Sequence, residues 1–209
     1  MMIWWHWLSV MGSLAVTGPI GVAIAVWLLA GRSWRLTAIW TVLFGAGMVL
    51  VVGTKIAFMG WGIGIQSLEF AGISGHAMRA AAVFPVAGFL AFRSSPLAVR
   101  HSATALGVLL AVLISISRVY VRAHSVSEVV AGCLLGLALA ALFIWYAGNE
   151  RHMALSRVLV ALCLPILLVA PRVEPIPAET WIAQAALYLS GRDQPYTRAI
   201  WRAPRPRML

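Results

Sequence analysis

The chain alternates long apolar stretches with short polar segments, and six of these stretches predict helices. They cover residues 8–30, 36–54, 75–92, 101–117, 129–148 and 153–170. A helix that crosses the hydrocarbon core of a bilayer needs about 20 predominantly apolar residues. The pattern therefore predicts an all-α, polytopic membrane protein in which residues 1–170 form a domain of six transmembrane helices.

The composition of the whole chain agrees with a membrane environment. Of the 209 residues, 62% are hydrophobic and 11% are charged, whereas soluble domains average about 45–50% and about 25%. A disordered chain is excluded because its composition is the reverse. Both cysteines lie inside apolar stretches, which excludes a disulfide-stapled secreted scaffold. The net charge of +10 indicates contact with membrane lipids and not with nucleic acid, because the basic residues form no stripe interleaved with aromatics.

The first apolar stretch is expected to remain in the protein as a membrane anchor. It is too long for a removable signal peptide, and it lacks both a basic n-region and a small-residue cleavage site. Tryptophans at positions 4, 5 and 7 precede it, as in the aromatic belts of membrane proteins. We therefore expect the start of the chain to lie at the membrane interface.

Residues 171–209 form a second predicted region, a Pro- and Arg-rich tail. Prolines stand at positions 171, 175 and 177, and arginines are frequent at the end of the chain. Residues 178–190 are too few to span a bilayer, but one helical face would carry Trp181, Ile182, Ala185 and Leu189. This segment predicts a short amphipathic helix on the membrane surface. Two interpretations of the arginine-rich end stay open, binding to anionic headgroups and disorder.

The short loops predict the orientation of the protein. Six arginines lie in the loops at 31–35, 93–100 and 149–157, and such an excess marks the cytoplasmic side. The loops at 55–76 and 118–128 then face outward. We therefore expect an integral protein of the bacterial cytoplasmic (inner) membrane.

Three polar clusters lie on the outward side, at the ends of the second to fifth predicted helices. They consist of Lys55, then Ser74, Gly75 and His76, and then Ser117, Arg118, His124 and Glu128. His124 and Glu128 are four residues apart, a spacing at which helical side chains meet. Ser74 and Gly75 would present free backbone N–H groups at a helix N-terminus, which attract an anion. The clusters together predict a phosphate-binding site.

These clusters resemble the three sequence signatures of the type 2 phosphatidic acid phosphatase (PAP2) superfamily. The string Ser117-Arg118, five residues, His124, three residues and Glu128 is similar to the third signature, SR-x5-H-x3-D. Residues 73–76, Ile-Ser-Gly-His, resemble the second signature, PSGH, and Lys55 resembles the start of the first, K-x6-RP. The resemblance covers about residues 36–148.

Three positions depart from the signatures. The Arg-Pro pair of the first signature falls on Gly62 and Ile63, so an expected phosphate-binding arginine is missing. Ile73 stands in place of the usual proline of the second signature. Glu128 replaces the aspartate of the third, which keeps the charge and lengthens the arm by one methylene.

The resemblance implies catalysis through a phosphohistidine intermediate. His124 would be the nucleophile, Glu128 would orient it and stabilise its developing charge, and His76 would protonate the leaving group and then activate water. The residues that the resemblance implies for holding the phosphate are Lys55, Ser74, Gly75 and Arg118. This arrangement requires no metal and no cofactor.

Arg79 is a candidate replacement for the missing arginine. It follows His76 by three residues and so shares its helical face. An arginine placed within lipid costs about 2.5–3.5 kcal/mol on insertion scales, which favours an inward orientation. We hypothesise that Arg79, or as a second choice Arg122, binds the phosphate. The alternative is a structural pairing of Arg79 inside the bundle, for example with Glu128 or Glu69.

Together these features predict a membrane enzyme that hydrolyses a lipid phosphate or pyrophosphate at the outer face of the cytoplasmic membrane. A site at the membrane surface favours a lipid substrate, and the family analogy offers undecaprenyl pyrophosphate, phosphatidic acid, phosphatidylglycerophosphate and the lipid A 1-phosphate. Two alternatives stay open. One is transfer of the phosphoryl group to another lipid. The other is a family member that has lost catalysis and binds lipid or a partner protein.

Overall fold

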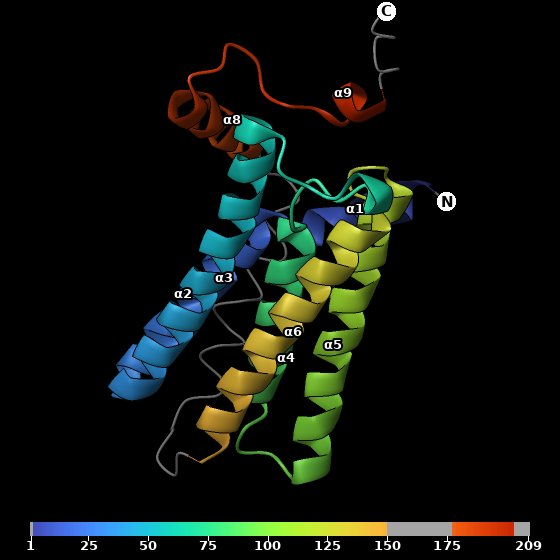
Figure 1. The fold of residues 1–209 in the computed structure, drawn as a ribbon. Helices are drawn as coiled ribbons and strands as arrows, with labels where there is room; N and C mark the ends of the chain where they lie inside the picture. Colours follow the sequence, from blue (N-terminus) through green and yellow to red (C-terminus); the bar gives the residue numbers. More distant parts are fainter. Residues whose placement is uncertain (1, 150–176, 203–209) are drawn as a thin grey trace, which may run out of the picture.

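A computed structural model describes residues 2–149 and 177–202, and the regular structure in these ranges is helical throughout. The long helices run side by side, with α1, α8 and α9 gathered at one end of the bundle (Figure 1). The elements are α1 Met2–Met11, α2 Leu14–Ala30, α3 Trp34–Trp61, the 3-10 turn η1 Gln66–Leu68, α4 Gly75–Ala91, α5 Leu97–Tyr120, α6 Val126–Gly148, α8 Ala178–Ser190 and α9 Arg198–Arg202.

Four segments of the described chain are long and apolar enough to cross a membrane. They are Trp4–Ala30, Trp34–Trp61, Leu97–Tyr120 and Val126–Gly148. Large apolar side chains project from the bundle along these segments, including Val22, Val49, Leu106 and Leu134, each more than 60% exposed. Such a surface fits lipid as the solvent. The sixth predicted helix, residues 153–170, lies outside the described residues, so the number of six helices stays a prediction.

The predicted first helix, residues 8–30, is wrong as one continuous element. The chain breaks at Gly12 and Ser13 into α1 and α2, and Ser13 has an extended backbone with ψ 159°. Gly12 lies closely against α4 and α5. A Cβ at this position would approach Ile114 Cγ2 to 2.6 Å and His76 Cβ to 3.4 Å. The close packing explains the break: α1 turns across the end of α5, where Trp5 stacks on Tyr120 with ring centroids 4.3 Å apart. The chain is strongly apolar on both sides of this turn, so the hydropathy pattern does not reveal it.

α4 is shorter, with 17 residues, and forms the centre of the bundle between α5 and α6. Most of its side chains are buried, including alanines and Val83 with no exposure. Glycines on its neighbours allow the close approach. A Cβ at Gly136 of α6 would lie 2.2 Å from the Met78 carbonyl oxygen, and one at Gly107 of α5 would lie 2.5 Å from that of Phe84. A helix so enclosed does not need the full length of a lipid-exposed span.

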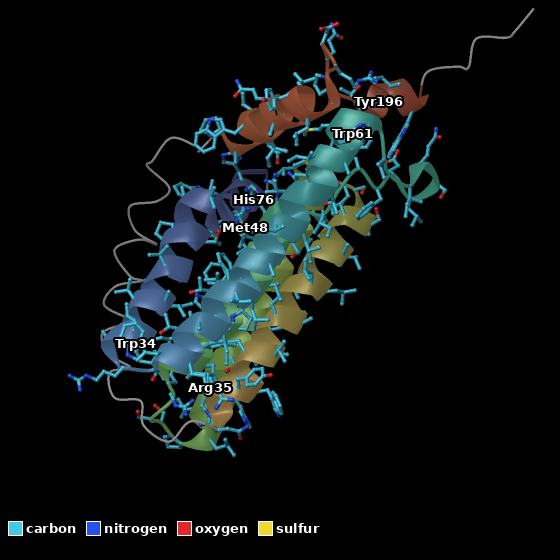
Figure 2. The ribbon with its side chains drawn as sticks, turned by 60° about the vertical axis from the view of Figure 1, so that its left-hand side comes forward. Trp34, Arg35, Met48, Trp61, His76 and Tyr196 are labelled. Carbon is cyan, nitrogen blue, oxygen red and sulfur yellow. The ribbon has the colours of Figure 1, made fainter. Side chains whose placement is uncertain are left out.

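The two ends of the bundle differ in character. Figure 2 shows Trp34 and Arg35 at one end and Trp61 and Tyr196 at the other. At the Arg35 end, the Arg93 side chain donates a hydrogen bond of 2.5 Å to the carbonyl oxygen of Ala147 at the end of α6. The basic loops predicted to be cytoplasmic that fall in the described ranges therefore lie away from the predicted site.

The described part of the tail packs on the opposite end. α8 spans the residues for which the sequence predicts a surface helix, and it lies across the end of α3 (Figure 1). The backbone N–H of Tyr196 donates to the carbonyl oxygen of Met59 at 2.7 Å, and Trp201 packs edge-on against Phe58 with centroids 4.8 Å apart. The tail thus covers the end of the bundle that holds the polar clusters.

Candidate active site

The eight residues predicted for the site gather at this covered end of the bundle. Lys55 lies in the last two turns of α3, and Ser74 is the N-cap of α4, followed by Gly75 and His76. Arg118 belongs to the last turn of α5, His124 to the loop that follows, and Glu128 to the first turn of α6. Arg79 lies one turn into α4. Four helix ends therefore bring these predicted residues together.

The α3–α4 loop fixes Lys55 beside the start of α4. The backbone N–H of Ile73 donates to Thr54 Oγ1 at 3.1 Å, and that of Ser74 donates to the Glu128 carbonyl oxygen at 3.1 Å. Gly72 adopts φ +131°, and a Cβ there would approach the Lys55 backbone nitrogen to 3.2 Å. A glycine is needed at this turn because L side chains rarely adopt such a φ. The loop therefore ties α3, α4 and α6 together at the site.

His124 and Glu128 make the contact that their spacing predicts. His124 Nδ1 lies 2.8 Å from Glu128 Oε2, and the two side chains are 12% and 2% exposed. The carboxylate also accepts the backbone N–H of Ala71 on Oε1 at 2.7 Å and that of Ser125 on Oε2 at 3.2 Å. The Ser125 contact belongs to a capping box that starts α6. Several donors hold the carboxylate in place. Because Glu128 contacts Nδ1, the other ring nitrogen of His124, Nε2, takes no part in this hydrogen bond.

Burial and the neighbouring cations act on the charge of the His124 ring. Burial lowers the pKa of His124 below its ordinary value, and the positive charges of Lys55 and Arg118 lower it further, while the hydrogen bond and charge of Glu128 oppose these effects. The loop that carries His124 lies outside the helices. The ring is therefore neutral at neutral pH, which is the state that a nucleophile requires.

His76 lies in the middle of the positive charges. Lys55, Arg79, Arg118 and, in its protonated form, the His124 ring are all close enough for their charges to act on its imidazole. Figure 2 shows His76 at the end of the bundle that α8 covers. The two histidines thus belong to one site and do not open at opposite ends of the protein.

Arg79 is buried, and it is anchored to the N-terminal helices. Its Nε donates to Thr17 Oγ1 at 3.1 Å and its Nη2 to the Gly12 carbonyl oxygen at 3.4 Å. A Cβ at Gly75 would lie 2.8 Å from Arg79 Nη1, so the guanidinium lies beside the start of α4. The break between α1 and α2 places the carbonyl of Gly12 at this position. Arg79 is thus held by neutral partners next to His76.

A cavity of about 400 Å³ joins polar and apolar walls at the site. Four predicted residues line it, Lys55, Gly75, His76 and Arg79. The remaining lining residues are Ser13, Leu14, Met48, Val51, Val52, Ala178, Glu179, Trp181, Ile182 and Ala185. Ser74, Arg118, His124 and Glu128 are not part of this lining. Leu189, predicted to share the face of Trp181, is not part of this lining, and both side chains are more than half exposed.

Two buried polar atoms at the site have no hydrogen-bond partner within the described residues. They are Oγ of Ser74, whose residue is fully buried, and Nε of Arg118. The Nη1 atom of Arg118 donates to Ser9 Oγ on α1. An unpaired buried polar group costs free energy, and a ligand with acceptor oxygens would satisfy both donors.

Comparison with known proteins matches this arrangement to one family. The sequence profile of the PAP2 superfamily matches residues 56–152, the part of the chain that contains both histidines and Glu128. The chain belongs to the PAP2 superfamily. It is 33% identical over 200 residues to an uncharacterized 22.5 kDa protein in the cps region of Klebsiella pneumoniae, covering 93% of this chain and 95% of that one.

A second relative carries a functional name. Over 77 residues the chain is 36% identical to phosphatidylglycerophosphatase B of Bacillus subtilis (strain 168), which covers 36% of this chain and 38% of that protein. No solved structure matches the chain. The assignment to the PAP2 superfamily therefore rests on sequence similarity alone.

The structure adds residues outside the PAP2 superfamily match that the sequence does not single out. Glu179 of α8 forms an ion pair with Lys55, and Arg198 at the start of α9 forms one with Glu128. Thr17 and Ser9 hold Arg79 and Arg118. Thr17 and Ser9 could have been noticed in the sequence as polar residues in an otherwise apolar first stretch. For the tail residues the sequence offers only their charge, because their partners lie far away along the chain.

Proposed function

We propose that this protein is a membrane phosphatase that hydrolyses a lipid phosphate or pyrophosphate through a phosphohistidine at His124. The observation that carries the proposal is the buried hydrogen bond between His124 Nδ1 and Glu128, beside His76 and three cationic side chains. Membership of the PAP2 superfamily and the similarity to a phosphatidylglycerophosphatase support the same reaction class.

In the first step, the free Nε2 of His124 attacks the phosphorus atom in line with the leaving oxygen. The P–N bond forms as the P–O bond breaks, and His76, protonated while the negative charge of the bound phosphate lies beside it, gives its proton to the departing alcohol or phosphate. The ring of His124 becomes positive, and the Glu128 carboxylate on Nδ1 stabilises this charge. The pair thus both fixes the tautomer and lowers the barrier.

In the second step, water replaces the protein as the partner of the phosphoryl group. His76, now neutral, accepts a proton from the water as the oxygen attacks the phosphorus, and the P–N bond breaks. Inorganic phosphate leaves, and both histidines return to their starting states. His76 lines the cavity, so water and the leaving group have access to it.

Cationic and polar donors stabilise the oxygens of the transferring group in both steps. Lys55 and Arg79 line the cavity, and Arg118 carries a buried, unpartnered Nε. The Ser74 hydroxyl and the Gly75 backbone N–H lie at the N-terminus of α4, where the helix dipole favours an anion. Arg79 takes the place of the arginine that the first signature lacks, because it lines the cavity and its hydrogen-bond partners, Thr17 and Gly12, are neutral.

The cavity favours a substrate with an apolar part. Its lining includes the polar side chains of Lys55, His76 and Arg79 and the apolar side chains of Leu14, Met48, Val52 and Ile182. The polar side chains suit a phosphate headgroup, and the apolar ones suit the start of a lipid chain. Phosphatidylglycerophosphate is the first substrate to test, because the Bacillus subtilis relative is named for it.

The test is phosphate release from a panel of lipid phosphates by purified protein in detergent. Wild type should release phosphate from at least one lipid, and His124→Ala should reduce the rate to background because the nucleophile is lost. A ³²P-labelled donor should label wild type and not His124→Ala. Equal release by both proteins would contradict the proposal. Thin-layer analysis of the products separates hydrolysis from transfer to a second lipid.

The proposal includes an outward-facing site in the bacterial cytoplasmic membrane, and thiol labelling tests it. Single cysteines replace Ile63, beside the site, and Leu97, at the opposite end. The wild-type residues at these positions are 65% and 57% exposed. Both cysteines are introduced into a background in which Cys133 and Cys163 are serine. A membrane-impermeant maleimide added to intact spheroplasts should label Ile63→Cys and not Leu97→Cys. The reverse pattern would place the site on the cytoplasmic side.

A further inference from the structure

The described part of the C-terminal tail is bound to the site by two ion pairs of opposite polarity. The acid of one pair, Glu179, comes from the tail and contacts Lys55 of α3. The base of the other, Arg198, comes from the tail and contacts Glu128 of α6. Figure 1 shows α8 and α9 at the end of the bundle at which α3 ends and α6 begins. The tail therefore complements the charges of the site on both sides.

α8 is part of the cavity wall. Five of the fourteen lining residues belong to its first two turns, Ala178, Glu179, Trp181, Ile182 and Ala185. Ala186 is fully buried against the end of α3, where its carbonyl oxygen lies 3.3 Å from the position of a Cβ on Gly60. α8 therefore forms a substantial part of the surface that a molecule in the cavity can contact.

The Glu179 carboxylate lies where the cations of the site converge. It contacts Lys55, and its negative charge also acts on Arg79 and Arg118. These are three of the groups that the proposed function assigns to the substrate phosphate. A carboxylate and a phosphate both offer negatively charged oxygens to such donors.

The two partners of this ion pair differ in their freedom to move. The Lys55 side chain is 8% exposed and fixed in the wall, whereas the Glu179 side chain is 62% exposed. A pair with one solvent-exposed partner is weak, typically worth well under a tenfold change in an equilibrium. The carboxylate can therefore leave Lys55 without unfolding its helix.

We propose that Glu179 occupies the phosphate position in the substrate-free protein and that the phosphate of the substrate displaces it. This inference rests on the proposed function and adds a residue of the tail to the substrate site. Glu179 is an internal competitor of the anion, and the α8 residues beside it, Trp181 and Ile182, contact the apolar part of the substrate that follows. The tail therefore contributes to the affinity of the protein for its substrate.

The experiment compares wild type with Glu179→Gln, which keeps the size of the side chain and removes its charge. The control is Asp193→Asn, which removes the same charge from the exposed turn after α8. Binding of inorganic phosphate is measured directly by the thermal stabilisation of each protein over a phosphate titration. Glu179→Gln should bind phosphate about two- to fivefold more tightly, as expected when a competitor of this strength is removed. Asp193→Asn should match wild type.

Two outcomes would overturn the inference. Equal phosphate affinity of Glu179→Gln and wild type would show that the carboxylate does not compete. Weaker binding by Glu179→Gln would show that Glu179 instead positions Lys55 for the anion. The binding assay needs no turnover, so it separates this inference from the proposed function: a protein that binds phosphate more tightly as Glu179→Gln but hydrolyses no lipid would contradict the function alone.

Discussion

Glu128→Gln is the substitution that tests the geometry of the site most directly. Glutamine retains the length of the side chain, and it also supports a capping box, so the start of α6 should remain intact. The carboxylate of Glu128 accepts Ala71 N–H on one oxygen and His124 Nδ1–H, Ser125 N–H and Arg198 on the other. An amide has one oxygen and cannot serve both sets of donors.

Either orientation of the new amide weakens catalysis. If its oxygen faces His124, the charge that stabilises the developing imidazolium is lost, and hydrogen bonds to a charged group are worth about 1.5–3 kcal/mol. Since 1.36 kcal/mol corresponds to a factor of ten, kcat should fall by about 10- to 150-fold. If its NH2 group faces Nδ1 instead, the ring proton moves to Nε2, the nucleophilic nitrogen is blocked, and the loss is larger.

The assay is the pH dependence of phosphate release, together with a thermal melt of each protein. Glu128 raises the pKa of His124, so its loss should move the acid limb of the kcat/KM profile to lower pH. Glu128→Asp retains the charge on a shorter arm and should fall between wild type and Glu128→Gln. A folded Glu128→Gln with kcat within about twofold of wild type and an unmoved acid limb would refute the reasoning, because the carboxylate would then do nothing to His124.

Three further predictions concern binding, pH and packing. Arg79→Ala should weaken inhibition by vanadate about tenfold or more, because one charged donor to the anion is lost, while Arg35→Ala at the opposite end should leave the inhibition constant unchanged. The acid limb of kcat/KM in wild type should lie below pH 6.5, because burial lowers the pKa of His124 and the neutral ring attacks; a limb above pH 7 would contradict this. Gly136→Ala should reduce the stability of the protein by about 1–3 kcal/mol and so lower its melting temperature, because the new Cβ meets a backbone oxygen of α4. Gly53→Ala, which has open space around it, should not lower the melting temperature. Equal melting temperatures of the two variants would contradict the close packing.

Much of the site is local along the chain and was therefore predictable. The contact of His124 with Glu128 follows from a four-residue spacing at the start of a helix. The position of Ser74 at the start of α4 follows from the boundary between a polar loop and an apolar stretch. The sequence predicts that Arg79 faces inward, and it lines the cavity with His76, with hydrogen bonds to Thr17 and to the Gly12 carbonyl oxygen.

Other features depend on how distant segments dock. Hydropathy predicted one helix over residues 8–30, but the chain turns at Gly12 to fit α4 and α5 and so presents a carbonyl to Arg79. The sequence predicts the tail only as a membrane-surface helix followed by arginines, whereas Glu179 and Arg198 of the tail form ion pairs at the site.

The sequence by itself determined the helical stretches at 36–54, 75–92, 101–117 and 129–148, the residues of the second and third signatures and the end of the bundle at which they lie, because apolar length and helical spacing act over a few residues. The tertiary structure decided the rest. Lys55 and Glu179 are 124 residues apart, and Glu128 and Arg198 are 70 apart. Periodicity fixes which side chains share a helical face, but the partner that a buried charge meets is set by the packing of whole helices against one another.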